Sequence, residues 1–167
     1  MLRKVSVRFA AVALAAGSLA TIPLATPVSA LTPHVACSKL VAKTTISGSN
    51  ATTTSSLSLC TPSALSAGAS SKVTTPAKNL AGKITSKMTW RNGKGTTTVV
   101  EQYKSASGQG KCPKGTSHIL LTGTTKTSTG AAASIIKVGE TISGSICANT
   151  KATPITSALE PGTKFKL

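Results

Sequence analysis

The chain has 167 residues, in which 19 lysines and arginines face only three acidic residues, and aromatic residues make up 2%. Without a single aspartate, a Ser–His–Asp hydrolase is excluded, and any core must be built mainly from Val, Ile, Leu and Ala. Hydrophobic residues reach 40% and charged residues only 13%, which excludes the apolar-poor, charge-rich composition of disordered chains.

Residues 1–30 are expected to be a signal peptide. Arg3, Lys4 and Arg8 form a basic start, residues 9–24 form an apolar run, and Val28-Ser29-Ala30 places small residues at a cleavage site. The apolar run has 16 residues, whereas a spanning helix needs about 20, so cleavage is favoured over retention as an anchor. We therefore expect one secreted β-domain at residues 31–167, extracellular or associated with the cell envelope.

This domain keeps most of the positive charge. When the three basic residues of the leader are removed from the total of 19, 16 remain against three glutamates, a net charge of +13. Ser and Thr account for 44 of residues 31–167. Threonine favours strands and serine favours turns, so the composition predicts a β protein with long polar loops.

The first two expected strands are residues 39–46 and 52–59, joined by a turn at Gly48-Ser49-Asn50. This hairpin would place Cys37 and Cys60 near each other at its open end. Residues 61–79 follow; they are rich in Ser, Thr, Ala, Gly and Pro and show no clear period. We expect them to form a long loop, with at most one short strand at residues 72–75.

The clearest strand covers residues 80–90. Leu80, Ile84, Met88 and Trp90 share one face, and polar residues alternate with them, as a half-buried strand requires. Asn92-Gly93 then suits a tight hairpin turn, and residues 96–103 form the returning strand.

Three further strands are expected at residues 117–124, 140–147 and 163–167, the first of which carries the apolar run Ile119-Leu120-Leu121. The pattern as a whole predicts an all-β fold: an antiparallel sandwich or small barrel of about 7–9 strands, with long polar loops and two disulfides.

Four cysteines in an exported chain indicate disulfides. Three pairings are possible, and we favour Cys37–Cys60 with Cys112–Cys147 because each closes a short loop. No CxxC motif occurs, and His34 and His118 do not bracket the cysteines at ligand spacing, so no metal and no cofactor are expected.

The sequence offers little for catalysis, and no catalytic residue is expected. Glu101, Glu140 and Glu160 are the only carboxylate side chains, and we expect them to be surface partners of basic groups. His34 lies in an N-terminal segment expected to be loose, and His118 flanks a strand. A hydrolase of unknown type remains a minor alternative.

Two functional hypotheses remain. In the first, the domain associates with anionic cell-wall polymers or lipid head groups through its lysines, and Lys83, Lys87, Arg91 and Lys94 form a possible anion-binding patch. Nucleic acid is not an expected partner, because the basic residues are not interleaved with stacking aromatics. In the second, the domain binds a small apolar ligand, with a core or cavity formed by Leu80, Ile84, Met88, Trp90, Ile119 and Leu121. The oligomeric state is left open.

Several short motifs resemble those of small secreted Ser/Thr/Gly-rich β proteins of actinobacteria. The motifs are Gly82-Lys83-Ile84-Thr85, Trp90-Arg91-Asn92-Gly93-Lys94, Cys112-Pro113-x-Gly115, Thr122-Gly123-Thr124 and Pro161-Gly162-Thr163-Lys164-Phe165. The resemblance covers most of residues 37–167. It implies an exported β-domain, and it implies no activity and no functional residues.

Overall fold

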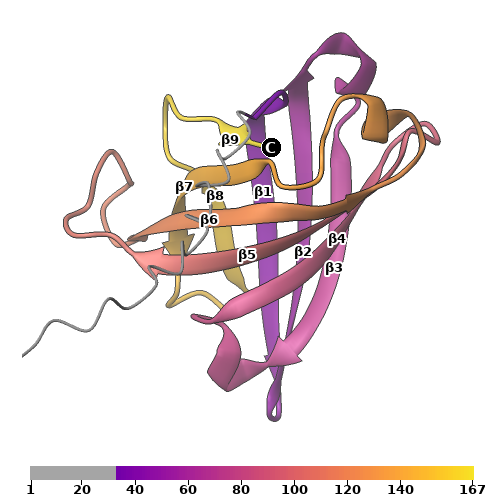
Figure 1. Ribbon diagram of the computed structural model, residues 1–167. Coiled ribbons are helices and arrows are strands. Elements are labelled where there is room, and N and C mark those ends of the chain that lie inside the picture. Colours follow the sequence, from indigo (N-terminus) through magenta and orange to yellow (C-terminus); the bar gives the residue numbers. More distant parts are fainter. Residues whose placement is uncertain (1–32) are drawn as a thin grey trace, which may run out of the picture.

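The computed structural model describes residues 33–167, which form nine β-strands and three short 3-10 helices (Figure 1). The expected leader, residues 1–30, lies outside the described residues. The strands are β1 (Ala36–Ser47), β2 (Asn50–Thr61), β3 (Ala69–Pro76), β4 (Lys83–Trp90), β5 (Gly95–Ser105), β6 (Ser117–Ser128), β7 (Thr141–Asn149), β8 (Ile155–Leu159) and β9 (Phe165–Lys166). The helices are η1 (Ser63–Leu65), η2 (Ala77–Asn79) and η3 (Gly130–Ser134).

The strands form a closed antiparallel barrel. Each of β1 to β7 pairs with the next strand along the chain, and β1 also pairs with β8, which closes the barrel. β9 pairs with the start of β1 and with Ser143 of β7, beside the gap that the short β8 leaves between them. The all-β class, the antiparallel pairing and the strand number are thereby confirmed, and the architecture is a barrel rather than a sandwich.

The expected long loop at residues 61–79 was wrong. It contains the eight-residue strand β3, which pairs with β2 from Ala69 opposite Leu57 to Pro76 opposite Asn50. The inward positions of β3 include Ala69, Ser71 and Val73. These side chains are small or polar, so the alternation that reveals a half-buried strand is weak in the sequence.

The strand expected at residues 80–90 begins at Lys83 in the structure, and buried and exposed residues alternate along it. Ile84, Ser86, Met88 and Trp90 are buried and the residues between them are exposed. Asn92 and Gly93 both have positive φ, at 57° and 66°, as the expected tight turn between β4 and β5 requires.

The two ends of the barrel differ. Because the strands run up and down, the starts of β1, β3, β5 and β7 meet at one end, and there the core closes the barrel around Trp90, Phe165, Leu65 and Ile136. The opposite end carries the β1–β2 turn, η2, and the connections at residues 106–116 and 150–154. No helix in the described part of the chain is long and apolar enough to cross a membrane.

Both expected disulfides are present. Cys37 and Cys60 occupy directly paired positions of β1 and β2, with Cα atoms 3.9 Å apart. Cys112 and Cys147 attach the 106–116 connection to β7. Two disulfides in a chain of this size are typical of an oxidising, extracellular environment.

Replacing Cys112 and Cys147 together by alanine should lower the free energy of unfolding by roughly 4 kcal/mol, because the bond closes a loop of 35 residues. The Cys37–Cys60 bond closes a loop of 23 residues, so the Cys37→Ala/Cys60→Ala variant should lose roughly 3 kcal/mol. Urea unfolding measures both, and unchanged midpoints would contradict the prediction.

Candidate functional site

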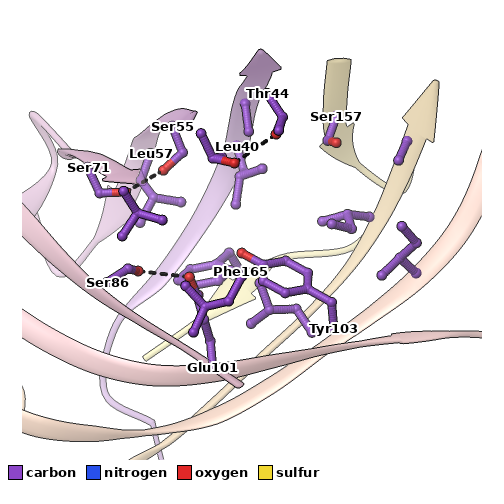
Figure 2. Close-up of a pocket in the computed structure, with 18 of the residues that line it drawn as sticks. Leu40, Thr44, Ser55, Leu57, Ser71, Ser86, Glu101, Tyr103, Ser157 and Phe165 are labelled. Carbon is purple, nitrogen blue, oxygen red and sulfur yellow. Dashed lines mark hydrogen bonds between the residues drawn. The ribbon is translucent and has the colours of Figure 1, made fainter. Parts of the chain in front are cut away.

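A cavity of about 200 Å³ lies inside the barrel, between the core and the end that carries the β1–β2 turn (Figure 2). Strands β1 to β8 all contribute to its lining, and Phe165 of β9 reaches it as well. The exposed Thr150 and the half-buried Leu80 belong to the lining, so the cavity opens toward solvent at this end.

One wall of the cavity is rich in small hydroxyl side chains from β1, β2 and β3. The Oγ1 atoms of Thr44 and Thr53 are 2.8 Å apart, and so are the Oγ atoms of Ser55 and Ser71. These cross-strand hydrogen bonds satisfy the hydroxyls in pairs, so this wall can adjoin an apolar group without leaving them without a partner.

The facing wall is largely apolar. It is built from inward side chains of β4, β6 and β7, namely Ile84, Met88, Ile119, Leu121 and Ile146. Phe165 lies below them, and Figure 2 shows its ring near that of Tyr103.

Glu101 of β5 is the carboxylate of this cavity. It is only 6% exposed, and the Ser86 hydroxyl donates a hydrogen bond of 2.8 Å to its Oε1 (Figure 2). Burial raises the pKa of Glu101, and the hydroxyls of Ser86 and Tyr103 partly oppose that rise by stabilising the charged form. Burial, together with the neighbouring Glu101 carboxylate, also raises the pKa of Tyr103.

Glu101 was expected on the surface, and that expectation was wrong. The alternation of β5 shows why it is buried: Thr97, Val99 and Glu101 share one phase, and all three are buried. The apolar Val99 therefore indicates in the sequence that this face of β5 points inward. Carboxylates are rarely buried, so residue type alone predicts an exposed position for Glu101.

The structure separates the six residues expected to form a core or cavity. Leu80, Ile84, Met88, Ile119 and Leu121 line the cavity. Trp90 does not; it belongs to the closed end, where its Nε1 donates a hydrogen bond of 2.9 Å to the Thr97 hydroxyl.

The four residues of the expected anion-binding patch follow β4 in a line. Lys83 and Lys87 are exposed on its outer face, and Arg91 and Lys94 lie in the turn beyond it. At about 3.3 Å per residue, the backbones of Lys83 and Arg91 are roughly 26 Å apart. Arg91 and Lys94 also line a second hollow of about 160 Å³ with residues 63–68. The four therefore form an extended stripe rather than one compact site.

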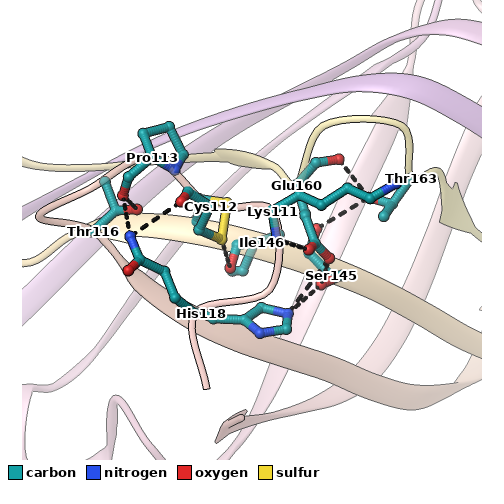
Figure 3. Close-up of a disulfide and its surroundings, with 11 residues drawn as sticks. Lys111, Cys112, Pro113, Thr116, His118, Ser145, Ile146, Glu160 and Thr163 are labelled. Atoms are coloured by element: carbon teal, nitrogen blue, oxygen red, sulfur yellow. Dashed lines mark hydrogen bonds and ion pairs between the residues drawn. A yellow bond between two sulfur atoms is a disulfide. The ribbon is translucent and has the colours of Figure 1, made fainter. Parts of the chain in front are cut away.

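A second polar cluster lies outside the cavity, next to the Cys112–Cys147 disulfide (Figure 3). The Ser145 hydroxyl donates to Glu160 Oε2 over 2.6 Å and lies 2.7 Å from His118 Nε2. The Lys111 backbone N–H donates to Glu160 Oε1 over 2.5 Å. These bonds hold the pKa of Glu160 below its usual range and attach the 106–116 connection to β6 and β7.

This cluster contains serine, histidine and carboxylate, but it does not have the geometry of a catalytic triad. A triad needs the imidazole between the serine and the acid, one ring nitrogen for each. Here Ser145 and Glu160 both lie on the Nε2 side of His118, while its buried Nδ1 has no hydrogen-bond partner. The Ser145 hydroxyl donates to Glu160, so the cluster is suited to attaching the 106–116 connection to the barrel.

Glu140 is also buried rather than on the surface. Its Oε1 lies 2.8 Å from His34 Nδ1 and accepts a hydrogen bond of 2.9 Å from the Lys137 backbone N–H. The segment around His34, expected to be loose, is therefore attached to the η3–β7 connection.

In residues 33–167, no group of three or more His, Cys, Asp or Glu side chains is arranged to hold a metal ion. Comparison with known proteins finds no match for this chain among protein-family models, curated proteins or solved structures.

Replacing Glu101 by glutamine should stabilise the protein increasingly as the pH rises. The folded state binds the Glu101 proton more tightly than the unfolded state, so ionisation costs stability from about the ordinary pKa of 4.5 upward. The difference in unfolding free energy between Glu101→Gln and the unmodified protein should therefore grow from pH 4 to pH 8.

Glu160→Gln is the matched control with the opposite sign. The pKa of Glu160 is lowered, so its stabilising effect is complete above 4.5 and is lost as the pH falls through the lower folded value. This variant should be most destabilised at neutral pH and least in acid. Equal pH profiles for the two variants, from urea unfolding, would contradict the burial of Glu101.

Proposed function

We propose that the protein is a secreted, non-catalytic β-barrel that binds a small, predominantly apolar molecule in its internal cavity. The observation that supports this proposal is the lining of the cavity: one apolar wall, one wall of mutually satisfied hydroxyls, and a single hydrogen-bonded carboxylate. Ligand sites combine these features, with apolar surface for affinity and few polar groups for orientation.

The cavity volume limits the size of the ligand. An engineered cavity of about 150 Å³ takes benzene, so 200 Å³ accommodates a molecule of roughly eight to ten heavy atoms. A long-chain lipid would be too large. The ligand is therefore a monocyclic or short branched compound.

Enlarging a side chain that points into the cavity should weaken ligand binding. Ala42 lines the cavity, and Ala158 lies on the neighbouring strand at an exposed position. Ala42→Leu should reduce the affinity for toluene about tenfold or more, because the added carbons occupy the ligand's volume, whereas Ala158→Leu should leave it unchanged.

The Met88 methyl group gives a direct readout, because Met88 lines the cavity and the chain has only one other methionine, Met1. With ¹³C-methyl methionine, toluene should shift the Met88 signal in the unmodified protein and in Ala158→Leu. No shift with toluene, benzyl alcohol or benzylamine would overturn the proposed function.

A second candidate function is association with anionic polymers of the cell envelope, favoured by how the charges are distributed. Fifteen of the 16 basic residues at positions 33–167 are exposed, Lys94 being half-buried, while all three glutamates are buried. The outer face of the described barrel therefore presents positive side chains without acidic ones to offset them. Such a surface attracts polyanions over a range set by ionic strength.

The protein should sediment with isolated cell envelopes at low salt and be released as salt rises toward 1 M, where the Debye length is about 3 Å. Replacing Lys83 and Lys87 by glutamine should lower the salt needed for release. Retention that is unaffected by salt would contradict an electrostatic association.

A further inference from the structure

The carboxylate of the cavity, Glu101, has no cationic partner within residues 33–167. The charged side chains of the described chain include 16 bases, yet no lysine, arginine or histidine is among the residues of 33–167 that line the cavity. The titratable groups that face one another there are Glu101 and Tyr103 of β5; the neighbouring β4 contributes Ser86 and Ile84, and β6 contributes Ile119 and Leu121.

A buried carboxylate without a countercharge is costly, because hydroxyl donors replace only part of its lost hydration. Ser86 supplies one hydrogen bond to Oε1. The rise in the pKa of Glu101 through burial is consistent with this incomplete compensation. A ligand that brings a positive charge next to Glu101 would remove the cost, since charge-assisted hydrogen bonds are stronger than neutral ones.

We infer that the ligand of this cavity is an amine with a compact apolar body, whose ammonium group pairs with Glu101 while the body packs against Ile84, Met88 and Leu121. The inference rests on the proposed function and names the chemical class of the ligand. A carboxylate ligand would meet Glu101 as a like charge, and a neutral ligand would leave the buried carboxylate without a countercharge.

The lysines at the open end of the cavity affect the entry of an amine ligand more than the stability of the ammonium–Glu101 pair. The exposed lysines in the elements at this end are Lys78, Lys83, Lys104, Lys111, Lys114 and Lys151. In 0.15 M salt the Debye length is about 8 Å, so their repulsion of an incoming amine is largely screened. Glu101 is only 6% exposed, so a charge pair formed there is screened much less than the surface lysines.

The test compares four ligands of similar size: benzylamine, benzyl alcohol, toluene and benzoate. Their affinities are measured in 0.15 M salt at pH 7 from the ¹³C-methyl signal of Met88. In the unmodified protein benzylamine should bind about tenfold or more tightly than the other three. Glu101→Gln should remove that preference and keep toluene binding, while Glu160→Gln, which removes a carboxylate outside the cavity, should preserve it.

A second measurement does not depend on the folding of any variant. With ¹³C-carboxyl glutamate, the three glutamates of the chain give three signals. Over a pH titration, benzylamine should lower the pKa read from the Glu101 signal, because a neighbouring ammonium group stabilises the carboxylate, and it should leave the Glu140 and Glu160 signals unchanged.

The outcomes separate the inference from the proposed function. If benzyl alcohol, toluene or benzoate binds as tightly as benzylamine, or if benzylamine does not lower the pKa of Glu101, the amine inference is wrong and the ligand-binding function stands. If none of the four shifts the Met88 signal, both are wrong.

Discussion

The double pairing of β1 determines most of this structure. β1 pairs with β2 along almost its whole length, and its other edge pairs with β8 from Val41 to Thr44 and with β9 at Ala36 and Cys37. Because this second edge is occupied, the sheet closes on itself and the inward side chains of eight strands face one another. A closed barrel offers no exposed edge for strand addition, and it encloses a volume that small side chains do not fill. The cavity is therefore a consequence of closure combined with the small residues of β1 to β3.

Basic and acidic side chains of the barrel differ in their exposure to solvent. Of the 16 basic residues at positions 33–167, 15 are exposed and Lys94 is half-buried, whereas each of the three glutamates is buried and forms at least one hydrogen bond to another part of the chain. Glu140 attaches the segment at His34, and Glu160 attaches the 106–116 connection through the Lys111 backbone and Ser145. Glu101 differs from these two because its protein partners are hydroxyl groups alone, and it lies against the cavity. For this reason the proposed ligand contact is assigned to Glu101 and not to Glu160 of the Ser145–His118–Glu160 cluster.

The strands that the sequence predicted and the two that it did not, β3 and β8, differ in what their inward side chains face. β4 packs Met88 and Trp90 against the core, so large and polar residues alternate and the strand is readily predicted. β3 faces the cavity, where Ser71 and Val73 suffice, so its alternation is weak and it was expected to be a loop. β8 was missed for a similar reason, since its five residues include Ser157 facing the cavity. A strand that lines a cavity does not need large apolar side chains to fill a core. Hydrophobic periodicity then predicts the strand poorly.

The sequence by itself determined the β class, the surplus of positive charge, the Asn92-Gly93 hairpin and the favoured disulfide pairing, because each depends on composition or on residues close along the chain. The closure of the barrel, the burial of all three glutamates and the position of Trp90 outside the cavity were decided by tertiary structure alone. Each of these depends on contacts between residues far apart in the chain, such as His34 with Glu140 and β1 with β8. Whether a carboxylate points into a cavity or toward solvent is set by which face of its strand the closed barrel encloses. The local alternation of β5 indicates only that Glu101 shares a face with Val99, and it does not show that this face borders a cavity.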